Sequence, residues 1–261
     1  MIIYDQLNRE ICLKGTPKRI VSLVPSQTEL LVDLALDDAI VGITKFCVHP
    51  NHLRKTKTIV GGTKQVDFEK IKTLNPDIIL CNKEENTKDI VEQCESICNT
   101  HVSDVYTITD SIVLIKQYGN MFDCENEALE ICSTIQSNLK DFKNFIAKKP
   151  VLSVAYFIWK NPWMVAANHT FINHLLELNN FKNRFNELER YPKVELENIK
   201  NETDVVLLSS EPFPFKKKHI QEVQNETESS NVILVDGEYF SWYGSRLIRA
   251  FNYFKTLRAE F

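Results

Sequence analysis

Short apolar runs alternate with amphipathic stretches along the whole chain. In the first half, runs typical of buried or extended strands lie at 20–24, 40–43, 78–81 and 101–107, and helical patterns lie at 29–36, 68–74, 87–97 and 110–122. The second half repeats this order, with strands at 151–155, 204–208 and 232–235 and helices at 170–178, 196–200, 217–224 and 245–258. Strands that alternate with helices predict βα units and parallel sheets.

Signals at the ends of these stretches agree with this interpretation. Ser26 and Glu29 have the S-x-x-E spacing of a capping box, which satisfies amides of the first helical turn. Pro76 and Asp77 follow the helix at 68–74 and end it before the next strand.

One segment recurs almost residue by residue. Asp77 is followed by an apolar strand and then by Glu84, and Asp204 is followed by an apolar strand and then by Glu211. The Asp-to-Glu spacing is the same in both copies, and Ile-Lys precedes each copy at 71–72 and 199–200. Two buried strands can look alike by chance, but the shared order of elements favours a duplication with two similar lobes.

A long amphipathic stretch at 126–148 separates the two halves, and its apolar residues recur at helical spacing. About 23 residues at 1.5 Å per residue give a helix of roughly 35 Å. We therefore predict an α/β protein with two pseudo-symmetric lobes, each a central parallel sheet flanked by helices, joined by one long rigid backbone helix. The predicted boundaries are 1–122 for the first lobe, 123–149 for the connecting helix and 150–261 for the second lobe.

Composition narrows the function. With 43% hydrophobic and 25% charged residues, the chain is not a disordered, collagen-like or coiled-coil sequence. The net charge of −4 and the lack of a strongly basic stretch argue against a nucleic-acid partner. No G-x-G or G-K-[ST] occurs among the seven glycines, so the usual nucleotide-binding loops are absent, and no catalytic motif is present. We expect a binding protein without a covalent cofactor.

The ends and the cysteines leave the compartment open. Asp5, Arg9 and Glu10 interrupt the first ten residues before a signal-peptide core can form, and no apolar run approaches 18 residues. The seven cysteines suit reduced core thiols better than a disulfide framework. Two groups are alternative candidates for a metal site, although neither has a clear fourth ligand. These groups are Cys47 with His49 and His52, and Cys94 with Cys98 and His101.

Loops that follow the strands of an open parallel sheet face its ligand crevice. In this chain those loops are rich in aromatic residues, and all three tryptophans fall in them. Rigid aromatic faces with a few polar anchors suit a flat or bulky organic ligand, and the Arg246 guanidinium could hold a carboxylate or phosphate. The alternative is that these aromatic side chains close the cores of the lobes. The candidate ligand-binding residues are Pro25, Ser26, Lys45, Phe46, His49, Trp159, Trp163, Phe213, Tyr239, Trp242, Tyr243 and Arg246.

Glu84 and Glu211 occupy the same place in the two copies of the repeat. No nucleophile or metal ligand is evident beside Glu84 and Glu85, so an acid/base pair there is poorly supported. One carboxylate at the same place on each lobe instead predicts docking with a partner whose two halves are related by a two-fold axis.

The chain resembles the Fe³⁺-siderophore, haem and vitamin B12 class of ABC-importer substrate-binding proteins, and among them the cobalamin-binding branch. The resemblance covers nearly the whole chain and rests on the segments 19–29, 74–80, 161–165 and 239–246. It implies a corrinoid, haem or iron chelate held between two lobes, with the loop 239–246 packed on the corrinoid and Glu84 and Glu211 on permease arginines. Lys45, Phe46 and His49 are expected to form the wall of the first lobe.

The resemblance also implies a monomer that works in the periplasm with ABC permease subunits. Because no signal peptide is evident, a cytoplasmic enzyme or chaperone that handles a corrinoid or another metal chelate on the same scaffold is the alternative.

Overall fold

Continuous apolar runs form the central strands of two parallel sheets. The computed structural model describes residues 1–199, 203–227 and 231–261, and the chain divides into two compact units. Unit 1 comprises Met1–Gln136 and Tyr243–Ile248, whereas unit 2 comprises Ser137–Trp242 and Arg249–Phe261. Unit 1 therefore includes a short segment from the second half of the sequence.

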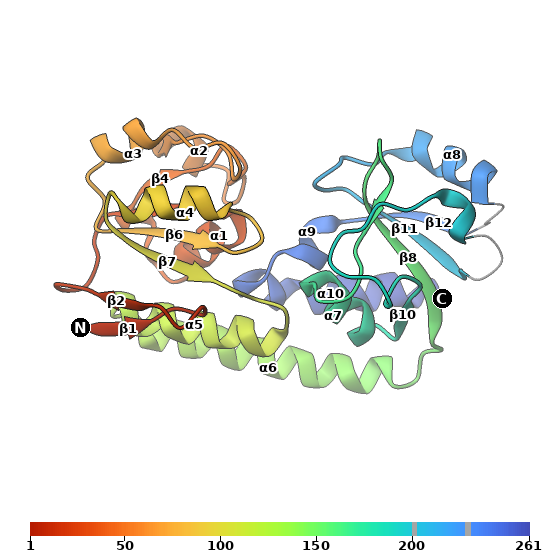
Figure 1. Cartoon of the computed structure of the whole chain (residues 1–261). Coiled ribbons are helices and arrows are strands. Elements are labelled where there is room, and N and C mark those ends of the chain that lie inside the picture. Colours follow the sequence, from red (N-terminus) through yellow and green to blue (C-terminus); the bar gives the residue numbers. More distant parts are fainter. Residues whose placement is uncertain (200–202, 228–230) are drawn as a thin grey trace. The chain divides into compact units, whose positions relative to one another are not determined.

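Unit 1 is a five-stranded sheet with helices around it (Figure 1). Its elements in chain order are β1 (Ile2–Tyr4), β2 (Glu10–Cys12), β3 (Ile20–Ser22), α1 (Pro25–Asp33), η1 (Asp37–Ala39), β4 (Ile40–Ile43), α2 (Leu53–Thr56), β5 (Thr58–Ile59), α3 (Phe68–Thr73), β6 (Ile78–Asn82), α4 (Lys88–Glu95), β7 (Asn99–Ser103), α5 (Ile108–Phe122), the start of α6 (Glu125–Ile146), and η3 (Gly244–Arg246). The strands are all parallel in the order β5-β4-β3-β6-β7. Every residue of β3 and β6 is buried, as expected for a parallel sheet covered on both faces.

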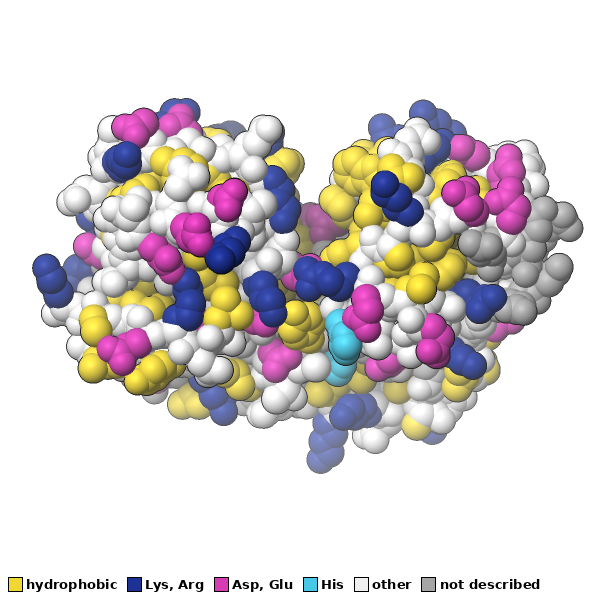
Figure 2. Space-filling view, in the orientation of Figure 1, with side chains coloured by type: hydrophobic (Ala, Val, Ile, Leu, Met, Phe, Trp, Pro, Cys, Tyr) yellow, Lys and Arg dark blue, Asp and Glu magenta, His cyan; other side chains and the backbone are white. Residues whose placement is uncertain are grey.

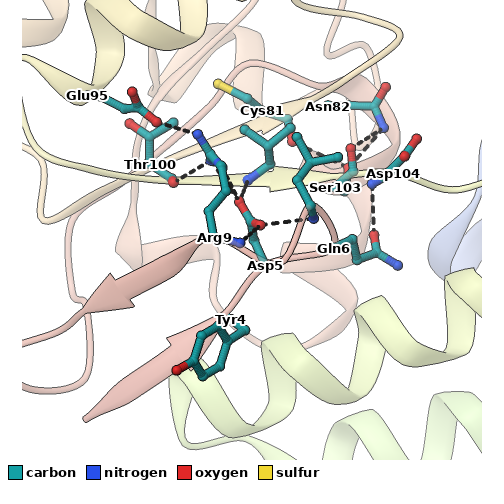
Figure 3. Close-up of polar contacts among 12 residues, drawn as sticks. Tyr4, Asp5, Gln6, Arg9, Cys81, Asn82, Glu95, Thr100, Ser103 and Asp104 are labelled. Carbon is teal, nitrogen blue, oxygen red and sulfur yellow. Dashed lines mark hydrogen bonds and ion pairs between the residues drawn. The ribbon is translucent and has the colours of Figure 1, made fainter.

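The strands β1 and β2 form a separate antiparallel ribbon. Side chains of the ribbon turn attach it to the edge strand β7 (Figure 3). Asp5, in the turn of this ribbon, accepts hydrogen bonds from the backbone amides of Leu7 and Arg9 and from that of Val102 on β7. Gln6 accepts another from the amide of Asp104. The buried Asp5 carboxylate thus organises the turn, and together with Gln6 it anchors the turn beside β7.

Unit 2 contains a second sheet with a closely similar plan. Its elements are the end of α6, β8 (Leu152–Trp159), β9 (Met164–Val165), α7 (Phe171–Leu178), β10 (Phe181–Asn183), η2 (Leu196–Ile199), β11 (Val205–Ser209), α8 (Lys217–Thr227), β12 (Val232–Val235), α9 (Gly237–Ser241), and α10 (Leu247–Ala259) from Arg249 onward. The parallel strands run in the order β10-β8-β11-β12, and β9 pairs antiparallel with β8.

Four parallel strands of each sheet lie in the same order. In unit 1, β3 lies between β4 and β6, and β7 lies outside β6; in unit 2, β8 lies between β10 and β11, and β12 lies outside β11. The edge strand β5 of unit 1 has no parallel counterpart among the described strands of unit 2. The predicted α/β fold with two pseudo-symmetric lobes is therefore confirmed. The predicted long helix is α6, which begins in unit 1 and ends in unit 2. The boundaries 1–122, 123–149 and 150–261 stay a prediction.

Some local predictions were wrong or incomplete. Helix α1 begins at Pro25 after Val24, and no side chain caps it, so Ser26 and Glu29 do not form a capping box. Ser26 lies inside the first turn instead, and Glu29 pairs with Arg246. The segment Gly237–Ser241, expected as part of a loop, is the short helix α9. Of the helix predicted at 196–200, Leu196–Ile199 forms η2, and Lys200 lies outside the described residues.

Side-chain caps fix several other helix starts. Thr107 and Asp110 form a capping box at α5, Thr170 caps α7, and Asp236 caps α9. Among the residues with described positions, no helix is both long and apolar enough to cross a membrane.

Candidate functional site

A cluster of aromatic side chains lies at the carboxyl end of the unit 2 sheet. We call it the aromatic cluster and define it as Phe157, Trp159, Trp163, Phe213 and Phe215. The β8–β9 hairpin supplies the first three, since Trp159 pairs with Met164 at the hairpin end, and the segment after β11 supplies the other two. Carboxyl ends of parallel strands lie at one edge of a sheet, which brings these two segments together.

The rings of the aromatic cluster contact one another in a continuous series. Trp159 meets Phe213 edge-on at 5.7 Å between centroids, Phe213 meets Phe215 at 4.8 Å, and Phe215 stacks on Trp163 at 6.0 Å with 5° between planes. Phe157 meets Trp163 edge-on at 5.5 Å between centroids. Phe157 is fully buried, whereas Trp159 is 39% exposed. The cluster thus has a buried base and an accessible top, which suits it to contact an apolar ligand face.

Lys160 lies beside this cluster. Its Nζ is 5.4 Å from the centroid of Trp163 and forms an ion pair with Glu222 of α8. A cation within about 6 Å of an indole face is attracted to it. The Lys160–Glu222 ion pair therefore borders one edge of the aromatic cluster.

In unit 1, Phe46 and Lys45 protrude from the loop after β4. Phe46 is 49% exposed, and the Lys45 Nζ lies 5.1 Å from its ring centroid. The Lys45 amide donates to the Gly61 carbonyl, and a Cβ placed on Gly62 would lie 3.1 Å from the Phe46 ring. The turn at 61–62, where no aromatic residue occurs in the sequence, is thus covered by Phe46. His49, in the same loop, is half-buried.

The predicted ligand loop 239–246 divides between the units. Tyr239 belongs to unit 2 and stacks on Tyr253 of α10, with centroids 4.6 Å apart and 19° between planes. Trp242, also in unit 2, is only 6% exposed and donates from Nε1 to Glu211 at 2.9 Å.

Tyr243 belongs to unit 1 and joins a buried polar network there. Its hydroxyl lies 2.9 Å from Gln27 Nε2 and 3.1 Å from Ser103 Oγ, and Asn82 Nδ2 donates to Ser103 Oγ at 2.9 Å. Tyr118 donates to the other end of the Gln27 amide. Burial raises the pKa of the Tyr243 hydroxyl, so it stays protonated and can donate.

Arg246 lies in η3 and is 6% exposed. Its Nε donates to the Glu29 carboxylate at 2.9 Å, and Gly244 donates from its amide to Ser111 Oγ at 2.8 Å. Arg246 therefore fastens the segment 243–248 to α1, a role that the sequence pattern did not suggest. Pro25 and Ser26 are buried in the first turn of the same helix.

Glu84 and Glu211 occupy equivalent turns in different surroundings. The Glu84 amide donates to Asn82 Oδ1 at 2.8 Å, and the Glu211 amide donates to Ser209 Oγ at 3.3 Å, so in each copy the last strand residue holds the turn. The Glu211 carboxylate also accepts from Ser241 and Trp242. The pKa of the Glu211 carboxyl is raised, mainly by desolvation. The hydrogen bond from Ser241 lowers this pKa but does not outweigh the desolvation.

The cysteines are all free thiols. Within residues 1–199, 203–227 and 231–261, no three His, Cys, Asp or Glu side chains are grouped so that they could hold a metal ion. Cys47 is buried, and its Sγ lies 3.1 Å from Thr28 Oγ1 and 3.3 Å from Thr44 Oγ1. On the face drawn in Figure 2, charged side chains of both signs are interspersed on each unit.

Sequence reasoning missed three residues next to these groups. Phe215 joins the aromatic cluster, and the sequence Pro-Phe-Pro-Phe at 212–215 signalled a second aromatic side chain there. Lys160 and Gln27 were missed because a lone lysine or glutamine carries no pattern of its own. Their partners, Glu222 and Tyr243, lie 62 and 216 residues away in the sequence.

Comparisons with known proteins agree with this architecture. The family described as "Periplasmic binding protein" matches residues 20–232. An uncharacterized ABC transporter substrate-binding lipoprotein of Bacillus subtilis is 29% identical over 189 residues, which cover 69% of this chain and 60% of that protein. A vitamin B12-binding protein of Pectobacterium carotovorum is 22% identical over 242 residues, 90% of this chain and 86% of that protein.

Solved structures share the fold. A periplasmic vitamin B12 binding protein of Vibrio cholerae has a TM-score of 0.79 at 18% identity, covering 94% of this chain and 98% of that one. A periplasmic heme binding protein of Pseudomonas aeruginosa has a TM-score of 0.81 at 18% identity, covering 93% of this chain and 92% of that one.

Proposed function

Because the chain belongs to the periplasmic binding protein family, it is a substrate-binding protein rather than an enzyme, and we propose that it serves an ABC importer whose cargo is a corrinoid or a related metal chelate. Family members are extracytoplasmic binding proteins. The names of relatives and structural neighbours include vitamin B12-binding and heme-binding proteins, which supports this class of cargo.

The aromatic cluster of unit 2 is the observation that carries the proposal. A macrocyclic chelate presents a large, rigid and largely apolar face, and aromatic side chains bind such a face at small cost in conformational entropy. Trp159, at the exposed end of the cluster, is the residue most available to such a ligand. Tyr239, half-buried in the same unit, offers further aromatic surface.

Lysines at the edges of these rings suit the acidic groups of such chelates. Lys160 lies against Trp163 and Lys45 against Phe46, so in each unit an ammonium group flanks an aromatic ring. In unit 1, a carboxylate or phosphate of a chelate would be attracted to the Lys45 ammonium group while the chelate face rests on the Phe46 ring. In unit 2, the Lys160 ammonium group already pairs with Glu222. Arg246 is left out of the proposed surface because its guanidinium is buried in an ion pair with Glu29.

The test is a titration of the purified protein with cyanocobalamin, haemin and ferric ferrichrome, followed by the absorbance of the chelate and by tryptophan fluorescence. We expect one of them to bind with a dissociation constant well below 10 μM, the weak end of the range for a receptor. If none binds below about 10 μM, the proposed cargo is wrong.

A single substitution tests the aromatic cluster. We expect Trp159→Ala to weaken binding of the chelate about tenfold, which corresponds to about 1.4 kcal/mol, because a large, half-exposed indole face is lost. Val151→Ala, which removes an exposed apolar side chain elsewhere in unit 2, should leave the dissociation constant within about twofold. Equal affinities for Trp159→Ala and the unaltered protein would place the ligand elsewhere.

We further propose that this protein works outside the cytoplasmic membrane, as its family does. Fractionation of cells that express the gene at its natural level should recover it with the periplasmic or membrane-anchored proteins. Recovery with cytoplasmic enzymes alone would contradict this location.

A further inference from the structure

Glu211 lies in the turn after β11, where this turn touches the start of α9. A Cβ placed on Gly237 would lie 2.2 Å from Ser209 Oγ and 2.7 Å from Glu211 Cγ, so only glycine fits there. The Gly237 amide donates to Ser210 Oγ at 2.9 Å, and Ser209 Oγ donates to the Glu211 carbonyl at 2.6 Å. The backbone at the start of α9 is thus in direct contact with side chains of the turn.

The Glu211 carboxylate extends this contact to the far end of α9. Its Oε1 accepts from the Ser241 hydroxyl and, at 2.9 Å, from Trp242 Nε1. Ser241 is the last residue of α9, and Trp242 is its C-cap. A five-residue helix has little intrinsic stability, so contacts of this kind decide where it lies.

The same turn leads into the aromatic cluster. Phe213 follows Glu211 by two residues and contacts Trp159, whereas Tyr239 lies in the middle of α9. Glu211 therefore joins two segments of unit 2, one that carries Phe213 and one that carries Tyr239.

Burial of this carboxylate argues for such a role. Removing a carboxylate from water is costly, and two donors from α9 and its C-cap offset part of this cost. A carboxylate whose only task is to meet a partner protein needs no partners inside its own fold. Glu238 and Asp236, on the α9 side, are the nearby acidic groups that oppose its charge.

We infer that Glu211 is a positioning residue, an inference that rests on the proposed function. Through its hydrogen bonds to Ser241 and Trp242, Glu211 holds the turn that carries Phe213 and the helix that carries Tyr239 in the relative positions that the ligand needs. It acts through these aromatic segments and does not itself touch the ligand.

Three substitutions test this role in ligand binding. Glu211→Gln keeps a carbonyl oxygen that can accept both bonds, whereas Glu211→Ala removes it, and Glu187→Ala removes an exposed carboxylate of the same unit. With cyanocobalamin, haemin and ferric ferrichrome as probes, we expect Glu211→Ala to weaken binding about tenfold, and Glu211→Gln and Glu187→Ala to stay within about threefold. Unchanged affinity in Glu211→Ala would overturn the inference.

A second measurement needs no ligand. Amide hydrogen exchange in 237–242 should be at least tenfold faster in Glu211→Ala than in the unaltered protein, and close to normal in Glu211→Gln. Trp242→Phe removes the Nε1 donor together with part of the buried indole, and it should speed exchange in the same direction. Its effect should be smaller when Glu211→Ala is already present, because the bond between the two residues is then already lost. Unchanged exchange in Glu211→Ala contradicts the inference, whereas failure of all three chelates to bind contradicts only the proposed function.

Discussion

His101 is a fully buried histidine in the middle of β7. Its ring meets Tyr118 of α5 edge-on at 5.4 Å, and its side chain is 0% exposed. Desolvation lowers the pKa of this imidazole from 6.5 to about 4, so the folded protein holds it neutral at physiological pH. The unfolded chain protonates the same histidine near pH 6.5.

His101 should therefore make the protein sensitive to acid. Its contribution to stability is complete above pH 6.5 and is lost as the pH falls to about 4, a change of about 3 kcal/mol. Urea unfolding of the unaltered protein and of His101→Leu between pH 7 and 4 measures this contribution, because the other titrating groups are common to both. We expect the unaltered protein to lose about that much more stability than His101→Leu between pH 7 and 4. Parallel stability curves would contradict the assignment.

Single residues also show where sequence reasoning ended. Phe46, Trp159 and Trp163 were predicted at strand ends, and they lie there. This could be predicted because the pattern of apolar residues shows where each strand ends. Trp242, Tyr243 and Arg246 were predicted to bind the ligand, which stays a prediction, whereas their bonds to Glu211, Gln27 and Glu29 were not foreseen. Nothing local distinguishes an arginine that will meet an anion from one that will meet a buried glutamate far away in the sequence.

At the scale of elements, propensity and periodicity located most helices and strands. The strands β3, β6 and β11 were predictable because buried parallel strands are continuous apolar runs. The ribbon of β1 and β2 was missed, since it depends on Asp5 bonds that reach β7. Helix α9 was missed because its position depends on contacts with the turn after β11.

The 3₁₀ turn η3 provides a test at this scale. Its Arg246 is buried with Glu29, and removing one partner of a buried ion pair leaves an uncompensated charge, which costs about 3–5 kcal/mol. We expect Arg246→Leu to lower the free energy of unfolding by about that amount in urea titrations. Lys88→Ala, which breaks an exposed pair with Glu92, should change it by less than about 1 kcal/mol. If both variants lost a similarly small amount of the free energy of unfolding, Arg246 would not hold η3 in place.

For the whole molecule, the carboxylates in the two equivalent turns should have separable roles. We propose that Glu84 meets a cationic side chain of the permease, and that Glu211 acts inside unit 2. Glu84→Lys should then leave the affinity for the chelate unchanged but reduce its uptake at least tenfold in cells that carry this variant as their sole copy. Uptake at the normal rate would remove Glu84 from the permease contact, and a loss of affinity would place it at the ligand site.

The assignment of Tyr243–Ile248 to unit 1 has a consequence for the order of events during synthesis. Tyr243 bonds to Gln27 across 216 residues of sequence, and Gly244 bonds to Ser111 across 133. At 5–20 residues per second, a ribosome needs roughly 10 to 40 s to make the chain between Gln27 and Tyr243. Throughout that time the nascent first unit lacks the segment that completes its buried polar network. The first unit should therefore be less stable on the ribosome than in the finished chain, because Gln27 and Ser111 still lack these partners.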